Sequence, residues 1–340
     1  MNRRITLMAI STCLVLALLV AGAFLLDLPM LVLEPGPAPD VATRSEIGAR
    51  TYPSKGSMHL TTARVNSPSG STAVEILEGL LDGDKHVVPR ESVYPSGQTD
   101  EQTEGAQAAQ MAQSESAAAT AALNELGMPS IPDGVFVTEV VAGGPAAKAP
   151  AARRIRAGDV ITGVDGQPVL TLDDLNKALE LHEPGDEVAF EVNRDGESKK
   201  FAVRTVESSQ RPGRAEIGVK VSQSNKAPIE ISIDAEEIGG PSAGLMFALS
   251  IYDRLIPEDL TGGRKIAGTG TIENLPDKSG KVGEVGAVDL KIKGASKVGA
   301  KVFVVPEGEL AAARSAATAG MTVIGVSTLS DAIEQLRKLG

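Results

Sequence analysis

The chain has 340 residues and a formal net charge of −11, with 42% hydrophobic and 23% charged residues. This length exceeds one ordinary domain, and the composition is that of a folded globular protein. The acidic balance argues against binding to nucleic acid, because phosphates require a surplus of Lys and Arg. The one cysteine, Cys13, excludes intramolecular disulfides and cysteine-based zinc clusters. We expect neither a metal nor a cofactor.

An uncharged apolar run, residues 5–26, follows Arg3 and Arg4. At about 1.5 Å per residue, a helix of this length spans about 33 Å, enough to cross a bilayer. The arginines predict a cytoplasmic N-terminus and place the rest of the chain outside the cytoplasm. We therefore predict a single-pass protein of the cell membrane, with residues 1–33 as its anchor. A cleaved signal peptide is the alternative, because Ala-Gly-Ala at 21–23 resembles a cleavage site.

The segment behind the anchor starts with a proline-rich, extended stretch at 34–39. Strand-like stretches such as 58–65 follow, and the polar residues 97–105 predict a loop. Residues 106–125 are rich in alanine and predict a helix that ends at Gly127.

Residues 134–206 contain short strand patterns, for example at 135–141 and 188–192, around one small helix that starts behind Thr171. This order, with its Gly-Asp-Val-Ile step at 158–161, resembles a PDZ domain. The resemblance implies a groove between a strand and the helix at 172–181, in which a peptide adds as an extra strand.

A loop that captures a peptide C-terminus is also expected in a PDZ domain. Leu126, Gly127 and Met128 are candidates for this loop. Equally, Gly127 ends the preceding helix, and the two roles are compatible.

After residue 212 the pattern alternates between strand and helix, which predicts an α/β arrangement. Strands are expected at 229–233, 302–305 and 323–326, and helices at 310–319 and 331–339.

The sequence Gly-Pro-Ser-Ala-Gly at 240–244 matches the G-x-S-x-G nucleophile turn of α/β hydrolases. That fold requires a histidine after the serine, whereas His59, His86 and His182 all precede it. The hydrolase interpretation therefore fails. A serine can otherwise be activated by a neutral lysine.

A lysine with the ordinary pKa of about 10.4 is neutral in only about one molecule in 10³ at pH 7, so a catalytic lysine must be desolvated. At about 100° per residue on a helix, Lys291 shares an apolar face with Val288 and Ala295. Lys293 and Lys297 point to the opposite side. Lys291 is thus the candidate base, and a lysine that snorkels from the helix edge is the alternative.

Three segments resemble Lon-type peptidases in the same order. Residues 237–245 resemble the nucleophile segment, 267–272 the following strand, and 280–291 the segment with the catalytic lysine. The whole layout resembles a bacterial family of membrane-anchored, PDZ-containing Lon-like proteases. The resemblance implies Ser242 as nucleophile and Lys291 as general base.

The resemblance also implies that Thr269 holds the lysine amine, with Gly240 and Ala243 supporting the nucleophile. Ser242 starts a predicted helix, whose first N–H groups could stabilise an oxyanion. The family often has an acidic residue where Gly239 stands, and the turn at 273–279 is longer than usual.

The predicted fold is α/β (α+β): a discontinuous Lon-type peptidase domain with an inserted β-rich PDZ domain and an N-terminal transmembrane helix. Residues 34–128 are the linker and the first part of the peptidase domain. Residues 129–207 are the PDZ domain, and residues 208–340 are the catalytic part.

The predicted function is that of an ATP-independent serine endopeptidase, because the chain has no P-loop motif. Its expected partners are extracytoplasmic proteins or peptides, engaged by the PDZ domain through exposed C-termini. Lon-like domains often form rings, so the resemblance also suggests a ring-shaped homo-oligomer. The main alternative is an inactive PDZ scaffold on a Lon-like fold. A penicillin-binding type of acyl enzyme requires Ser-x-x-Lys, but Leu245 stands at the lysine position.

Overall fold

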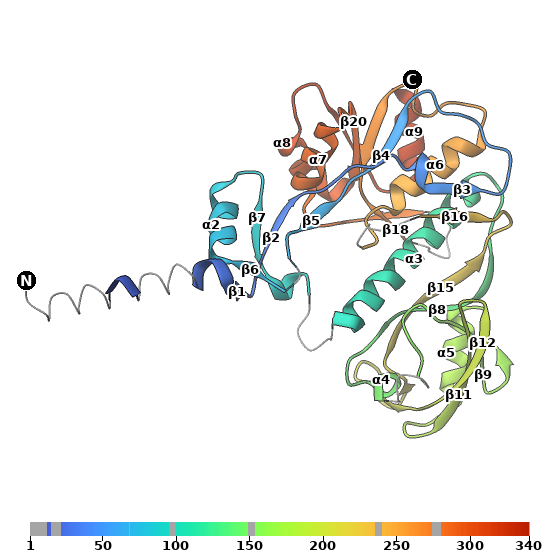
Figure 1. Cartoon of the computed structure of the whole chain (residues 1–340). Coiled ribbons are helices and arrows are strands. Elements are labelled where there is room, and N and C mark those ends of the chain that lie inside the picture. Colours follow the sequence, from blue (N-terminus) through green and yellow to red (C-terminus); the bar gives the residue numbers. More distant parts are fainter. Residues whose placement is uncertain are drawn as a thin grey trace, which may run out of the picture. The chain divides into compact units, whose positions relative to one another are not determined.

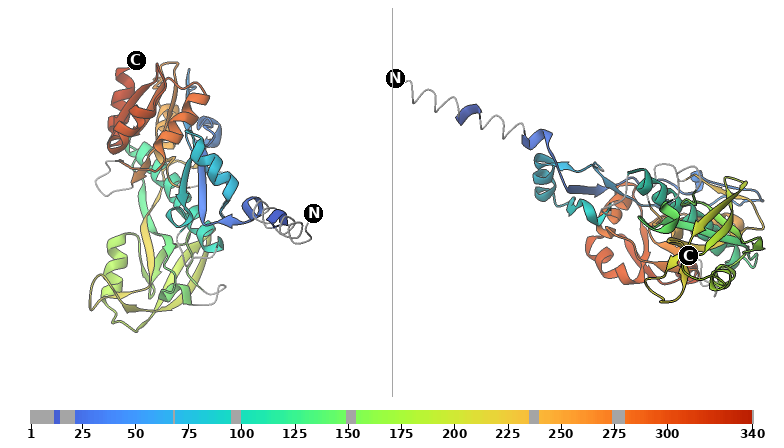
Figure 2. Two further views of the ribbon diagram at one scale, coloured as in Figure 1. Left: turned by 90° about the vertical axis from the view of Figure 1, so that its left-hand side faces the viewer. Right: turned by 90° about the horizontal axis from the view of Figure 1, so that it is seen from below.

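The computed structural model describes residues 12–14, 22–67, 69–94, 100–148, 154–234, 240–273 and 280–339. The chain divides into two units (Figures 1 and 2). The first unit consists of Met1–Pro37 and Ala63–Gly97, and the second consists of Ala38–Thr62 and Gln98–Gly340.

The first unit is built around β2 (Met30–Pro35), the central strand of a three-stranded antiparallel sheet with the order β5-β2-β7. Helix α2 (Ala73–Leu81) packs on this sheet through Gly79, where an added Cβ would lie 3.0 Å from Val87 and 3.2 Å from Val32. The remaining strands are β1 (Asp27–Leu28), β5 (Ala63–Val65), β6 (Ser71–Thr72) and β7 (His86–Pro89).

Most of the predicted anchor at 1–33 lies outside the described residues. Within the part that is described, no helix combines the length and the apolar character needed to cross a bilayer. The predicted C-terminal end of the anchor is wrong, because residues 27–33 form β1 and most of β2, with Leu31 and Val32 buried. Pro29 explains this difference, since a proline and the residue before it disfavour a continuing helix.

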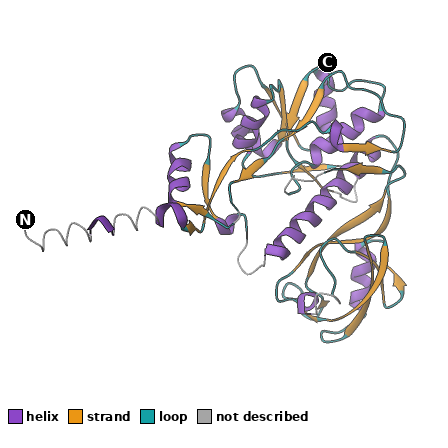
Figure 3. Ribbon diagram, viewed as in Figure 1, coloured by secondary structure: helices purple, strands orange, loops and turns teal. Residues whose placement is uncertain are grey.

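The second unit contains a parallel four-stranded sheet with the order β21-β20-β17-β4 (Figure 3). Successive residues of a strand face opposite sides, and both sides of this sheet are covered. Val304 of the central strand faces one core, whereas Phe303 and Val305 face another. The strands are β4 (Ser57–Leu60), β17 (Lys265–Gly268), β20 (Val302–Pro306) and β21 (Thr322–Val326).

The first core is shared by α3 (Asp100–Glu125), α6 (Gly244–Leu255) and α9 (Leu329–Lys338). The second core is covered by α7 (Val288–Lys297) and α8 (Leu310–Ala316). The predicted loop at 97–105 is wrong from Asp100 onwards, where α3 begins. Acidic residues in a first turn favour a helix through its dipole.

Elements far apart in the sequence assemble the first core. Met58 of β4 and Ala118 of α3 pack in the same cluster as Leu245 and Phe247 of α6. Strand β3 (Ser45–Ile47) pairs in addition with β16 (Ile231–Ile233). The residues between α3 and β16 form a sheet of their own, and the main core therefore combines chain segments on either side of it.

This inserted sheet has the strand order β12-β11-β9-β8-β15, with β10 paired to β9. It reaches Lys226 and thus extends beyond residue 207, where the PDZ domain was predicted to end. Helix α5 (Leu172–Glu180) starts with a capping box between Thr171 and Asp174. The strands are β8 (Ile131–Val140), β9 (Val160–Val164), β10 (Gln167–Pro168), β11 (Glu187–Arg194), β12 (Glu197–Arg204) and β15 (Val219–Lys226).

A buried ion pair holds the Gly-Asp step of this inserted part. Asp159 is buried and accepts hydrogen bonds from Arg194 Nε at 2.6 Å and Nη2 at 2.8 Å, and from the Arg156 N–H at 2.8 Å. These donors satisfy a carboxylate that would otherwise be costly to bury. The smaller elements are α4 (Pro145–Lys148), β13 (Val206–Glu207), β14 (Ala215–Glu216), β18 (Thr271–Glu273) and β19 (Lys281–Gly283).

Candidate functional site

The turn that carries Ser242 immediately precedes α6 and is held from two sides. The Ser114 hydroxyl on α3 donates to the Pro241 carbonyl at 2.9 Å. The Gly270 N–H donates to the Ser242 carbonyl at 2.9 Å, and the Thr269 hydroxyl donates to the same carbonyl at 3.1 Å. These contacts fix the backbone of Ser242 between α3 and the segment behind β17.

The small residues around Ser242 are needed for different structural reasons. Gly240 has φ +79° and open space around it. Glycine is therefore favoured at this position by the left-handed backbone conformation and not by lack of space. A Cβ at Gly244 would lie 2.8 Å from the Ser114 hydroxyl and 3.0 Å from the Ile272 backbone nitrogen, so glycine allows close packing here. Ala243 is buried in the core beneath the turn.

Lys291 lies on the buried face of α7 and is only 5% exposed. Its Nζ donates to the Thr269 hydroxyl at 3.2 Å, and Thr269 is itself fully buried. Thr269 therefore bridges the lysine amine and the Ser242 carbonyl. Among these described residues there is no direct hydrogen bond between Lys291 Nζ and Ser242 Oγ, and Thr269 links the lysine amine to the backbone of Ser242 rather than to its hydroxyl.

The electrostatic environment of Lys291 favours the neutral amine. Burial lowers the pKa of Lys291 from 10.5 to about 8, and the Glu309 carboxylate opposes this shift. Glu309 lies at the end of a short 3-10 helix (Glu307–Glu309) and accepts a hydrogen bond from the Val285 N–H at 2.8 Å. Burial raises the pKa of Glu309 itself.

Glu309 and Ser114 were not singled out as site residues from the sequence. Neither residue lies within 237–245, 267–272 or 280–291, and each reaches the site through a contact between distant parts of the chain. No local pattern of the sequence contains that information.

Leu126, Gly127 and Met128 directly follow the end of α3. Gly127 has φ +70° and donates its N–H to Asn124, and the Met128 N–H donates to the Leu123 carbonyl at 2.8 Å. This arrangement is a helix cap. Leu126 packs against the core shared by α3 and α6.

The strand beside α5 is β15, the edge strand of the inserted sheet. It runs antiparallel to β8, so that Val219 pairs with Val140 and Lys226 with Ile131. Residues 126–128 precede Ile131 and therefore lie toward the Lys226 end. The Gln223 side chain links β15 to the start of α5, because its Oε1 accepts from the Leu172 N–H at 3.3 Å.

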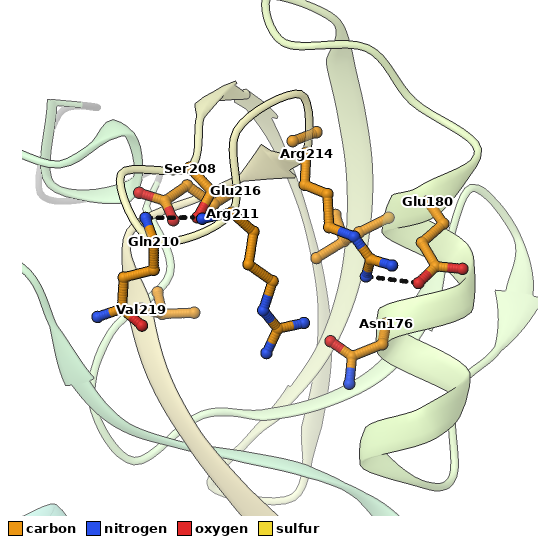
Figure 4. A pocket seen from close by; sticks show the side chains of 10 residues that line it. Asn176, Glu180, Ser208, Gln210, Arg211, Arg214, Glu216 and Val219 are labelled. Carbon is orange, nitrogen blue, oxygen red and sulfur yellow. Dashed lines mark hydrogen bonds and ion pairs between the residues drawn. The ribbon is translucent and has the colours of Figure 1, made fainter.

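The opposite end of α5 borders a cavity of about 230 Å³ (Figure 4). Asn176 and Leu179 of α5 line it on one side, and the loop before β15 lines it on the other. Arg211 extends its guanidinium into the cavity, whereas Arg214 is paired with Glu180 at 2.6 Å. The complete lining consists of Asn176, Leu179, Glu180, Ser208, Gln210, Arg211, Arg214, Ala215, Glu216 and Val219.

Comparison with known proteins identifies this inserted part. The family model described as PDZ domain matches residues 107–205. The chain thus contains a PDZ domain, a kind of domain that binds peptides or proteins. A search of curated proteins finds no match.

Several solved structures are similar to part of the chain. The PDZ domain of an SdrC-like protein from Listeria innocua is 24% identical, with a TM-score of 0.23, and the match covers 26% of this chain and 93% of that one. The corresponding domain from Listeria monocytogenes is 23% identical, with a TM-score of 0.23 and coverages of 26% and 87%. A solution structure from Geobacillus thermodenitrificans is 28% identical, with a TM-score of 0.23 and coverages of 26% and 97%.

Proposed function

We propose that the protein is an ATP-independent serine endopeptidase that uses Ser242 as nucleophile and Lys291 as general base. The observation that carries this proposal is the buried amine of Lys291, which is hydrogen-bonded to Thr269 beside the Ser242 backbone. A lysine that costs free energy to bury is retained where its neutral amine is useful.

In the proposed reaction, neutral Lys291 takes the hydroxyl proton as Ser242 Oγ attacks the peptide carbonyl. The carbonyl carbon becomes tetrahedral, and the ammonium then donates its proton to the leaving amine as the peptide bond breaks. Water attacks the resulting ester with Lys291 again as base, which releases the new carboxyl end and restores Ser242. Thr269 holds the amine in position through both steps.

The oxyanion needs N–H donors that are not already used inside the protein. The N–H of Leu245 donates to the Gly270 carbonyl at 3.0 Å, and the N–H of Phe247 donates to the Ala243 carbonyl at 3.1 Å. We therefore assign the oxyanion to the earlier amides of the turn, those of Ser242 and Ala243.

Activity is expected to rise with pH as Lys291 loses its proton, with an acid limb near the pKa of about 8. The Glu309 carboxylate favours the ammonium and so raises this pKa. Glu309→Gln should therefore move the acid limb of kcat/KM to lower pH. Glu307→Gln, an exposed carboxylate of the same short helix, is the matched control. If the acid limb of kcat/KM stays in place or moves to higher pH in Glu309→Gln, Glu309 does not raise the pKa of Lys291.

For substrate capture, we propose that a peptide adds along the free edge of β15, with its C-terminal carboxylate in the cavity that Arg211 enters. The supporting observations are the edge position of β15, the neighbouring α5 and the Arg211 guanidinium that enters the cavity. The carboxylate loop is then the segment before Val219, and residues 126–128 keep the role of a helix cap.

Binding is expected to need both the free carboxylate and Arg211. In fluorescence titrations of the full chain, peptides with amidated C-termini should bind several-fold more weakly than free acids. Arg211→Ala should reduce the difference between acid and amide, because it removes the charge that the carboxylate meets. Arg204→Ala, an exposed arginine on β12, is the control and should leave both affinities unchanged. If Arg211→Ala weakens the binding of free-acid and amidated peptides equally, the C-terminal carboxylate does not lie beside Arg211.

We also propose that the uncharged run at residues 5–26 is a membrane anchor, with the catalytic part outside the cytoplasm. The length of this run and the arginines before it support the proposal. A reporter fused behind Gly340 should be active only outside the cytoplasm. Activity of the reporter in the cytoplasm would reverse the orientation.

A second candidate function is a PDZ scaffold without catalysis. The match to the PDZ family model favours it, because that match alone accounts for a peptide-binding protein. Absence of turnover in the unmodified protein, together with intact peptide binding, would select this function.

A further inference from the structure

Helix α2 presents three leucines to solvent. Leu77, Leu80 and Leu81 are 58%, 68% and 79% exposed. At about 100° per residue, the three side chains fall within an arc of about 100°. Gly79 points away from this arc, toward the sheet of the first unit. We call Leu77, Leu80 and Leu81 the leucine face.

The leucine face belongs to a well-formed helix. Thr72 and Glu75 form a complete capping box at its start, and the Asp82 N–H closes its end by donating to the Glu78 carbonyl at 2.9 Å. Exposed leucines that are held together on one side of a helix are typical of a surface that meets an apolar partner.

A second set of exposed apolar side chains lies at the end of the uncharged N-terminal run. Its members are Phe24, Leu25, Leu26 and Leu28. Leu28 belongs to β1, which pairs with β6, and β6 leads directly into α2. The two apolar sets therefore lie in the same unit and are joined through one strand pair (Figure 2).

We propose that the leucine face rests on the lipid surface at the base of the anchor, so that α2 is an interfacial helix. This inference rests on the proposed membrane anchor, whose apolar run ends beside the strand pair that carries α2. A bilayer covers both apolar sets at once, since the run that enters the lipid brings the leucine face to its surface.

The charges around α2 define the kind of lipid. Glu75, Glu78, Asp82 and Asp84 lie on the helix or in the turn behind it, with Lys85 next to them. Carboxylates are repelled by anionic headgroups, so the helix fits a zwitterionic surface such as phosphatidylcholine. Glu78 and Asp82 are exposed and can remain in water while the leucines enter the interface.

The test uses the full chain in phosphatidylcholine vesicles. Cys13→Ser removes the native thiol, and Leu80→Cys then accepts an environment-sensitive fluorophore. The matched control is Leu181→Cys, a leucine that is 84% exposed and follows α5 in the other unit. Nitroxide-labelled phosphatidylcholine should quench the label at position 80 several-fold more than the label at position 181.

Three results would overturn the inference. Equal quenching at the two positions leaves α2 in water. If the label at position 80 is shielded in detergent, and if this shielding increases with protein concentration, the leucine face binds a second copy of the chain. If the protein does not float together with the vesicles, the proposed anchor is contradicted. The basis for placing α2 at the lipid surface is then lost as well. Flotation is measured separately from quenching, so failure of the anchor is distinguishable from failure of the interfacial helix.

Discussion

In the 340-residue chain, Ser242→Ala or Lys291→Ala is expected to reduce hydrolysis of a loosely folded substrate protein by about 10³-fold or more. Ser242→Ala removes the attacking oxygen, and Lys291→Ala removes the amine that takes its proton. Because the two groups act as a unit, the double variant should be no slower than either single variant. The measurement is the initial rate of substrate cleavage by equal amounts of protein.

The matched control for this experiment is Lys297→Ala. Lys297 belongs to the same helix as Lys291 but is exposed on its other side. It should leave the cleavage rate unchanged. Equal rates in the unmodified protein, Ser242→Ala and Lys291→Ala would contradict the dyad. Peptide binding measured on the same samples shows whether the PDZ domain is intact, and thus separates lost chemistry from lost folding.

The second large effect concerns stability. Lys291→Met is expected to stabilise the protein by up to about 3 kcal/mol at pH 7 while abolishing activity. Lowering the pKa of Lys291 from 10.5 to about 8 corresponds to about 3 kcal/mol of unfavourable free energy for the buried ammonium. Methionine fills a similar volume without a charge, and Thr269 keeps its hydrogen bond to the Ser242 carbonyl.

The pH dependence of this gain follows from proton binding. Between pH 8 and 10.5 the unfolded chain holds the lysine proton more tightly than the folded protein, so the stability of the unmodified protein rises with pH in this range. The cost of the ammonium is fully present below pH 8. The advantage of Lys291→Met should therefore be largest below pH 8 and decline toward pH 10.5.

Urea unfolding of the full chain in mild detergent, followed by circular dichroism at several pH values, measures this difference. Lys297→Met, which changes an exposed lysine of the same helix, should alter the free energy of unfolding by less than about 0.5 kcal/mol. A destabilised Lys291→Met protein, or a gain that does not vary with pH, would show that burial of the amine carries no such cost.

Patterns within single elements were sufficient to predict several features of the fold. The spacing of apolar residues identified the buried side of α7 and with it Lys291, because a helix places every third or fourth residue on one face. A hydroxyl followed by an acidic residue located the start of α5 at Thr171. The end of the proposed anchor was predicted too far along the chain, because hydropathy outweighed the effect of Pro29.

By itself, the sequence determined which lysine faces an apolar core, where α5 begins and that a PDZ domain is present. Only the tertiary structure showed that Glu309 acts on Lys291, that Ser114 holds the Pro241 carbonyl and that β15 completes the inserted sheet. The physical reason is the range of the interactions. Helical periodicity and capping involve residues a few positions apart, whereas these contacts join residues whose approach depends on the packing of whole helices and strands.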